Sequence, residues 1–316
     1  MILKRPPELS IVIPSRTKDD RDLQRLLKAL AAQTYQDFEV LVETRGNSEE
    51  AKGRAALAAR GDIVGFFCTD NDIRDPRFLE VMVGYAKEPA VVGAYTERYD
   101  HVPSDAPLSR YFALLGANDP VCWWLGKADR ADYLQIPRKS ATAVTFQSGW
   151  IPSLGDNGFF IKREILLQAN FTPETFGSCM CVCADLQRLG HATYTIVPGV
   201  ALWHRTGEDA WDYLKRRWRY VRELYWKKLA MRRWVLVSSQ RDWWRAVSFA
   251  LASILVVPHL WVAWRGYQRV RDRAWFLHPV LCLALTCLYT AAWIEAVLTS
   301  AWSSVRGSGL TTYGGV

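Results

Sequence analysis

The sequence predicts an α/β protein in which a mostly parallel sheet is flanked by helices and followed by C-terminal membrane helices. Short β-rich runs alternate with segments of helical apolar spacing over the first hundred of 316 residues. This alternation is typical of βαβ units, whose crossovers are right-handed. Two long apolar runs then occur after residue 245. Their length is close to the roughly 20 residues that span a bilayer.

The first half of the chain predicts the sheet and its covering helices in order. The expected strands are residues 9–13, 38–42, 63–67 and 90–95, and the expected helices are 19–33, 48–60 and 76–86. The carboxyl ends of parallel strands meet at one edge of a sheet, and ligands bind beyond that edge. Residues 14–17, 43–46 and 68–72 each follow a predicted strand. We therefore expect these three segments to line one cleft.

The middle of the chain gives weaker signals. Residues 101–150 are rich in Pro, Asp, Ser and Trp and are expected to be irregular. A turn at 155–158 precedes a predicted strand and helix at 159–168, and a further helix is expected at 179–189. A pair of strands is expected before His204.

The basic charge of the chain is concentrated near its apolar runs. The net charge is +8, but residues 213–245 alone carry eleven Lys or Arg against two acids. Residues 1–212 are net acidic by subtraction. Basic residues beside apolar runs are attracted to anionic lipid head groups by roughly 1 kcal/mol each. The pattern therefore predicts membrane lipids as partners and argues against nucleic acid.

The two apolar runs predict membrane attachment. Residues 246–264 contain no formal charge, and tryptophans lie at both ends, where indoles prefer the head-group boundary. The N-terminus lacks the apolar region of a signal peptide, so residues 1–212 are expected on the cytoplasmic side of the cell membrane. The predicted parts are a catalytic domain (1–212), a basic amphipathic interface segment (213–245), two transmembrane or hairpin helices (246–302) and a flexible tail (303–316).

A pair of carboxylates follows the third predicted strand. Asp70 and Asp72 are two residues apart in the run that ends Phe-Phe-Cys-Thr-Asp-Asn-Asp. Carboxylates at a strand end suit Mg²⁺ or Mn²⁺, and such an ion neutralises the charge that grows on a departing nucleoside diphosphate. Asp-Asn-Asp is also ordinary turn chemistry. The motif becomes specific only in its context.

That context resembles a known family. Residues 9–42 (LSIVIPSRTKDDRDLQRLLKALAAQTYQDFEVLV) and 51–72 (AKGRAALAARGDIVGFFCTDND) are similar to family 2 of the inverting glycosyltransferases. The similarity extends over about residues 8–205. It implies the Rossmann-like GT-A fold, a UDP- or GDP-sugar as donor, and a divalent metal, Mg²⁺ or Mn²⁺. The membrane anchorage makes the polyprenyl-phosphate glycosyltransferases the most similar members.

The resemblance assigns roles on both sides of the transferred sugar. On the nucleotide-sugar side it implies a loop after the first strand, an acid facing the base, a basic residue near the phosphates and the Asp-x-Asp motif. These are Pro14, Ser15, Arg16, Glu43, Lys52, Asp70 and Asn71. On the acceptor side, Asp156 and Asn157 match a turn that touches the sugar. The implied metal ligands are Asp70, Asp72 and His204.

The chain departs from the family at the general base. An inverting transfer to a hydroxyl needs a base, usually an Asp near the start of the helix that ends at Gly190. That position falls near Ser178 to Cys181, where no carboxylate occurs. Asp185 and Glu174 are the nearest acids and the candidate bases. A polyprenyl phosphate acceptor would loosen this requirement, because it is largely ionised near neutral pH and can attack with little help from a base.

Three hypotheses follow from the sequence. The first is a metal-dependent inverting glycosyltransferase that acts on a lipid-linked or polyprenyl-phosphate acceptor at the cytoplasmic membrane face. The second is a processive polysaccharide synthase, suggested by Arg217-Trp218, although that motif would need Gln at Leu214. The third is a non-catalytic membrane scaffold related to these enzymes, which the missing acid near Cys181 supports.

Overall fold

The computed structural model describes residues 5–307 apart from 208, 223–228 and 230–231. A seven-stranded sheet forms its centre, in the order β2-β1-β3-β8-β5-β9-β7. The strands in this order are Phe38–Glu43, Leu9–Pro14, Ile63–Phe66, Phe159–Lys162, Gly93–Thr96, Thr193–Val197 and Thr142–Thr145. A second sheet has the order β4-β10-β6, with strands Asn71–Asp72, Leu202–His204 and Tyr99–Asp100.

The main sheet confirms the predicted α/β fold, with five of its seven strands pointing in one direction. β8 and β7 run antiparallel to their neighbours. The direction of β8 matters for the site, because Phe159 at its start pairs with Phe66 at the end of β3. The turn before β8 therefore lies at the same edge as the carboxyl ends of β1, β2 and β3.

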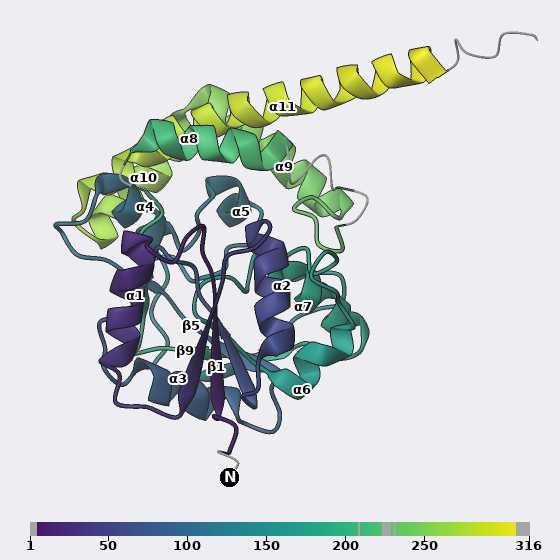
Figure 1. Ribbon diagram of the computed structural model, residues 1–316. Coiled ribbons are helices and arrows are strands. Elements are labelled where there is room, and N and C mark those ends of the chain that lie inside the picture. The colour runs from purple at the N-terminus through teal and green to yellow at the C-terminus, as the bar shows by residue number, and fades with distance from the viewer. Residues whose placement is uncertain (1–4, 208, 223–228, 230–231, 308–316) are drawn as a thin grey trace, which may run out of the picture.

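Apolar side chains on both faces of the sheet bury its central strands, whereas the edge strands β2 and β7 are half-buried and mostly exposed, respectively. Along β1, Val12 faces one core cluster, whereas Ile11 and Ile13 face the other. This alternation follows the two-residue period of a strand. Helices cover both faces of the sheet (Figure 1). They are α1 (Arg21–Ala31), α2 (Ser48–Ala58), α3 (Phe78–Ala86), α6 (Arg163–Leu166) and α7 (Cys179–Arg188).

Residues 101–150 contain more regular structure than the sequence predicted. Helices α4 (Pro107–Leu115) and α5 (Pro120–Trp124) and strand β7 lie in this stretch. Asp119 begins α5 by accepting a hydrogen bond from the Val121 backbone N–H. Side-chain caps of this kind satisfy the free N–H groups of a helix start.

The C-terminal helices form a layer over the carboxyl edge of the sheet (Figure 1). This layer comprises α8 (Ala210–Arg219), α9 (Gln240–Leu255), α10 (Val257–Arg269), a 3₁₀ turn at Arg273–Phe276 and α11 (Leu277–Gly307). Tyr213 on α8 and Trp275 before α11 pack with α4 in one apolar cluster. Lys127 and Asp242 form a buried ion pair of 2.7 Å between the two parts. The predicted domain boundary at 212/213 falls inside α8.

The first apolar run is not one straight helix. α9 and α10 meet at Val256 with a bend of 88°. Val256 has φ 63°, an unfavourable value for a β-branched residue. Among the described residues, one segment, Arg273–Thr299, is long and apolar enough to cross a membrane, and a second span exists if the bent pair counts as one. Only 22% of the most apolar window of that segment is buried.

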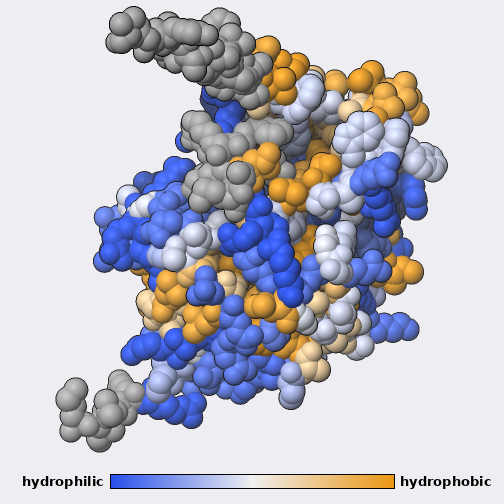
Figure 2. Space-filling model, turned by 90° about the vertical axis from the view of Figure 1, so that its right-hand side faces the viewer, coloured by the Kyte–Doolittle hydropathy of each residue, from blue (hydrophilic) through white to orange (hydrophobic). Residues whose placement is uncertain are grey.

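The outer surface of this layer is strongly apolar. Hydrophobic residues gather at the upper end of the molecule in Figure 2, above a more hydrophilic body. On α9 and α10 the exposed large apolar side chains include Trp243, Trp244, Ile254, Leu255, Val257, Leu260, Trp261 and Trp264.

Candidate active site

A cavity of about 350 Å³ lies between the carboxyl edge of the sheet and α8. Its lining combines one carboxylate, one imidazole and several arginines. The lining residues include Arg16, Asp70, Asn118, His204, Arg216 and Arg219. We call it the smaller cavity. Arg16, Asp70 and His204 were expected at this edge from the sequence, and the structure brings them together.

Asp70 and His204 form the centre of the smaller cavity. β10 pairs antiparallel with β4, which places His204 opposite Asn71 and beside Asp70. The His204 Nε2 lies 3.4 Å from the Asp70 Oδ2. Burial alone raises the pKa of the Asp70 carboxyl, but His204 and Arg216 together hold that pKa below its ordinary value. The Asp70 carboxyl is therefore ionised at neutral pH, and it is partly accessible from the smaller cavity.

Asp72 points in another direction. Its Oδ2 lies 3.4 Å from the Arg25 Nε on α1, and its Oδ1 accepts the backbone N–H of Ile73. Two of the three predicted metal ligands therefore converge in this conformation, and the third is paired with an arginine. The role of Asp72 as a ligand stays a prediction.

Asn71 and Asn157 hold the two halves of the site together. The Asn71 Nδ2 donates to the Asn157 Oδ1 at 3.0 Å, and both residues are buried. The Asn157 Nδ2 donates to the Tyr99 hydroxyl at 3.2 Å. These contacts join the strand end after β3 to the turn before β8. Both side chains are thus placed to position the site, and their predicted ligand contacts stay untested.

Lys52 and Asp156 form an ion pair under the site. Lys52 on α2 is almost fully buried, and its Nζ lies 2.9 Å from the Asp156 Oδ1. Burial lowers the pKa of Lys52, but the Asp156 carboxylate raises it above its ordinary value. Burial likewise raises the pKa of Asp156, and Lys52 more than offsets this. Both groups are charged at neutral pH.

Gly155 allows this turn to approach α7. Its φ is +132°, and a Cβ at this position would lie 2.2 Å from the Cβ of Cys179. Any side chain here would strain the backbone and collide with the helix. The glycine therefore lets the chain bring Asp156 over α2.

We expect Lys52→Met to destabilise the fold by about 1 to 3 kcal/mol, because it leaves the half-buried Asp156 carboxylate without its cation. The double variant Lys52→Met/Asp156→Asn should recover most of this loss. The stabilisation by Asp156 is complete above its unfolded pKa and is lost as pH falls through its lower folded pKa. Denaturant unfolding near pH 7 and pH 3 measures both effects. Equal stability of wild type and Lys52→Met would contradict the assignment.

The loops after β1 and β2 differ in what their predicted site residues contact. Pro14 ends β1, the Ser15 N–H donates to the Glu43 carbonyl at 3.0 Å, and Arg16 is exposed at the smaller cavity. Glu43 accepts from the Arg45 guanidinium, which lowers the pKa of its carboxyl to about 2. Glu43 is not among the described residues that line the smaller cavity. Its predicted contact with a base stays a prediction.

Helix α8 supplies residues that sequence reasoning placed outside the catalytic domain. Arg217 donates to the Asn118 backbone carbonyl at 2.9 Å, and its Nη1 lies 3.8 Å from the Asp119 Oδ2. Arg216 donates to the carbonyl of Thr206. Tyr213, Arg216, Arg217 and Tyr220 recur at helical spacing, and all of them line the smaller cavity. This spacing was the signal in the sequence that could have found them.

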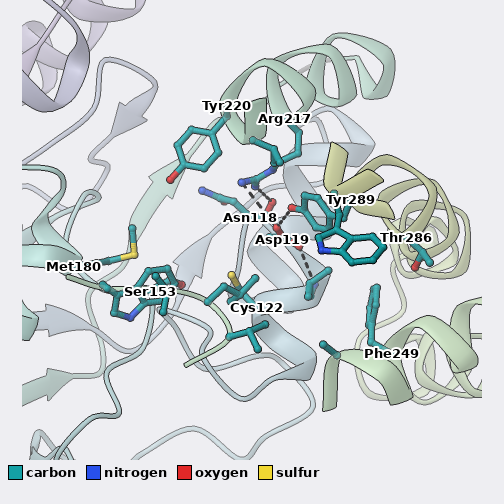
Figure 3. A pocket seen from close by; sticks show the side chains of 18 of the residues that line it. Asn118, Asp119, Cys122, Ser153, Met180, Arg217, Tyr220, Phe249, Thr286 and Tyr289 are labelled. Carbon is teal, nitrogen blue, oxygen red and sulfur yellow. Dashed lines mark hydrogen bonds and ion pairs between the residues drawn. The ribbon is translucent and has the colours of Figure 1, made fainter. Parts of the chain in front are cut away.

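A larger cavity of about 990 Å³ is lined by the residues drawn in Figure 3, and it shares lining residues with the smaller cavity. Its floor is polar and comes from the turn before β8 and the start of α5, whereas its walls come from the C-terminal layer. The floor includes Asn118, Asp119, Asp156 and Asn157, and the walls include Val221, Leu229, Val237, Val247, Phe249 and Trp293. Val221 and Leu229, from the predicted membrane-interface segment, therefore face this cavity.

Asn118, Arg217 and Tyr220 line both cavities. In Figure 3 the Arg217 and Tyr289 side chains point toward Asp119 from opposite sides. Tyr289 donates its hydroxyl hydrogen to the Asp119 carboxylate. The junction of the two cavities thus carries one arginine whose charge is partly matched by one buried aspartate.

The two candidate bases lie away from both cavities. Asp185 accepts from Arg233 and from Arg188, whose Nη1 is 2.9 Å from the Asp185 Oδ1. Glu174 is exposed and accepts from the Thr172 hydroxyl. Neither residue is among the described lining of either cavity. Cys181 is fully buried, and its neighbour Met180 reaches the larger cavity instead.

Comparisons with known proteins give architectural likenesses only. No protein-family model matches the sequence, and no curated protein matches it. A mannosyltransferase from Pyrobaculum calidifontis, solved with GDP-Man and Mn²⁺, is 13% identical with a TM-score of 0.49, covering 93% of this chain and 88% of that chain. TarS 1-349 from S. aureus is 12% identical with a TM-score of 0.43, covering 98% and 94%.

A third similar structure is glucosyl-3-phosphoglycerate synthase from Mycobacterium tuberculosis in complex with Mn²⁺ and UDP-glucose. It is 14% identical with a TM-score of 0.41, covering 71% of this chain and 79% of that chain. Likenesses at these values assign neither an activity nor a ligand to this chain.

Proposed function

We propose that this chain is a metal-dependent inverting glycosyltransferase that moves a sugar from a UDP- or GDP-sugar to a polyprenyl phosphate at the cytoplasmic membrane face. The observation that carries the proposal is the pair of cavities that meet at Arg217. One is small, polar and basic, and the other is large and mainly apolar. A charged donor and a lipid acceptor need this combination at one reaction centre.

The smaller cavity suits a nucleoside diphosphate. Arg16, Arg216, Arg217 and Arg219 surround it, and arginine guanidinium groups bind phosphate oxygens in a bidentate manner. Asp70 alone would repel a diphosphate. A divalent cation held by Asp70 would remove that repulsion.

Asp70 and His204 fit such a cation. Their facing atoms are 3.4 Å apart at the cavity wall, and the remaining ring nitrogen of His204 has no hydrogen-bond partner among the described residues. A carboxylate is a ligand that Mg²⁺ and Mn²⁺ accept. The cation would neutralise charge that develops on the leaving diphosphate. Asp72 would join them only after leaving Arg25.

The larger cavity suits a lipid phosphate better than a hydroxyl acceptor. Its apolar walls can cover an isoprenoid chain, while Asn118 and Arg217 at its junction can orient a phosphate. Asp185 and Glu174 lie outside its described lining, and Lys52 keeps Asp156 ionised with a lowered pKa. Asp156 is therefore a weak base. An ionised phosphate acceptor needs no general base.

The proposed step conserves charge and atoms. An oxygen of the lipid phosphate forms a bond to the anomeric carbon from the side opposite the leaving group. The bond between that carbon and the nucleoside diphosphate oxygen breaks, and the diphosphate leaves with the electron pair. No proton changes place. The two phosphates lie on opposite sides of the sugar, and Arg217, which lines both cavities, can stabilise the negative charge that develops on the departing diphosphate.

The apolar outer surface of α9–α11 supports membrane attachment. The exposed tryptophans at residues 243, 244, 261 and 264 suit the head-group boundary. The bend at Val256 suits a re-entrant pair of helices better than a straight span. With this layer in the membrane surface, the larger cavity lies directly beneath the lipid.

A release assay tests the proposal. The full chain in nanodiscs is incubated with Mn²⁺ and a panel of UDP- and GDP-sugars, with polyprenyl phosphate or, as the matched control, the polyprenol without phosphate. We expect nucleoside diphosphate release with one donor class, only with the lipid phosphate, and its loss with a chelator. Release at the same rate with polyprenol, or with no lipid at all, would exclude the proposed acceptor.

A further inference from the structure

Three side chains of metal-binding types converge within the C-terminal layer, and none of them is in the described lining of either cavity. They are His259 on α10 and His278 and Cys282 on α11, all buried, with their candidate ligand atoms within 4.8 Å of one another. Burying two imidazoles and a thiol in an apolar surrounding costs free energy unless these groups have partners.

The separations of these atoms fit a single ion. The His259 Nδ1 lies 3.2 Å from the His278 Nε2, and the Cys282 Sγ lies 3.7 Å from the same His278 atom. Nitrogen and sulfur ligands lie about 2.0 and 2.3 Å from a tetrahedral ion. Ligand atoms on such an ion are therefore roughly 3.3 to 3.8 Å apart. The two separations that involve the His278 Nε2 lie close to this range, and all three ligand atoms lie within 4.8 Å of one another.

The ring nitrogens that face away from the cluster are held by hydroxyl groups. The Tyr111 Oη lies 2.7 Å from the His278 Nδ1, and the Ser253 Oγ lies 3.1 Å from the His259 Nε2. Ser253 donates its hydrogen to the Phe249 carbonyl, so its oxygen accepts from the His259 Nε2–H. The His259 Nδ1 then carries its lone pair toward the His278 Nε2 and the centre of the cluster. Partners of this kind orient metal-binding histidines in proteins.

We propose that His259, His278 and Cys282 bind a thiophilic d¹⁰ cation, Zn²⁺ or Cu⁺. The thiolate and two imidazoles suit both ions. Cu⁺ would leave the cluster neutral, whereas Zn²⁺ would leave one positive charge and take a further ligand such as water. Either ion would fix α10 to α11, and through Tyr111 to α4.

The site would also stiffen one wall of the larger cavity. Phe249 lines that cavity and packs on the His259 ring at 5.2 Å, and Thr286 lines it one helical turn after Cys282. The proposal does not rest on the glycosyltransferase activity. It concerns how the C-terminal layer is held.

Metal analysis tests the site in the full chain. The Asp70→Ala variant serves as background, so that an ion at the smaller cavity does not contribute. We expect about one equivalent of zinc or copper per chain, and at least a fivefold loss on adding Cys282→Ser. Cys287→Ser is the matched control, because Cys287 is an exposed thiol on the same helix. It should keep the full equivalent.

Spectroscopy on the unmutated chain guards against a variant that fails to fold. After removal of metal, titration with Co²⁺ should give a thiolate-to-metal charge-transfer band that saturates at one equivalent. Added Zn²⁺ should abolish it, and titration with Cu⁺ shows whether the softer ion displaces Zn²⁺. Absence of this band, or equal metal content in Cys282→Ser and its background, would leave a hydrogen-bonded chain from Tyr111 to Ser253 and overturn the proposal.

Discussion

Asp70→Asn is expected to lower kcat/KM by roughly 10²- to 10⁴-fold, because it removes the carboxylate that would hold the cation. Among the described residues that line the smaller cavity, Asp70 is the only acid. Its backbone carbonyl accepts from the Arg205 N–H and is unaffected by the change, so the fold should remain. Steady-state kinetics and thermal unfolding of the same preparation measure both effects.

Asp212→Asn is the control for this variant, since Asp212 is an exposed acid on α8 that pairs with Lys215. It should retain full turnover. Asp72→Asn tests whether the carboxylate leaves Arg25 during the reaction, as the sequence motif predicts. Wild-type kcat/KM in Asp70→Asn at saturating Mn²⁺ would refute the proposed metal site.

Arg217→Met is expected to cost about 10²- to 10³-fold in kcat, the typical loss of one donor that stabilises developing negative charge. It should also lower the melting temperature, because Asp119 then loses the guanidinium beside its buried carboxylate. The double variant Asp119→Asn/Arg217→Met separates the two effects. It should recover most of the stability while activity stays low.

A structural role alone would give the opposite result. If Arg217 served only to pair with Asp119, the double variant would recover turnover along with stability. Arg219→Met is a useful companion, because Arg219 lines only the smaller cavity among the described lining residues. Its main expected effect is a higher KM for the nucleotide sugar.

The first half of the fold was predictable because its signals are local. β1, β2 and β3 are short apolar runs, and α1 and α2 begin at Asp20 and Asn47, whose side chains cap the helix starts. The position of Asp70 after β3 follows from this alternation. The family resemblance implied that His204 lies near the metal with Asp70, but the pairing of β4 with β10 that brings them together is not visible in local sequence.

The contribution of α8 to the site could not be predicted from local signals. Helical spacing marks one face of α8, but Asn118, which that face contacts, lies 99 residues from Arg217 in the sequence, and no local pattern connects the two. α4 was missed although Leu108, Tyr111, Phe112 and Leu115 recur at helical spacing. Pro258 was the available sign of the break between α9 and α10, because proline cannot continue a helix without losing a hydrogen bond.

Analysis of the lipid product tests the central claim most directly. Wild-type chain, Mn²⁺, the accepted nucleotide sugar and polyprenyl phosphate are allowed to react, and the lipid fraction is examined by mass spectrometry and NMR. The account predicts a single sugar joined to the lipid phosphate, with the anomeric configuration opposite to that of the donor. A product that retains the donor's configuration, a chain of several sugars, or no sugar on the lipid phosphate would contradict it.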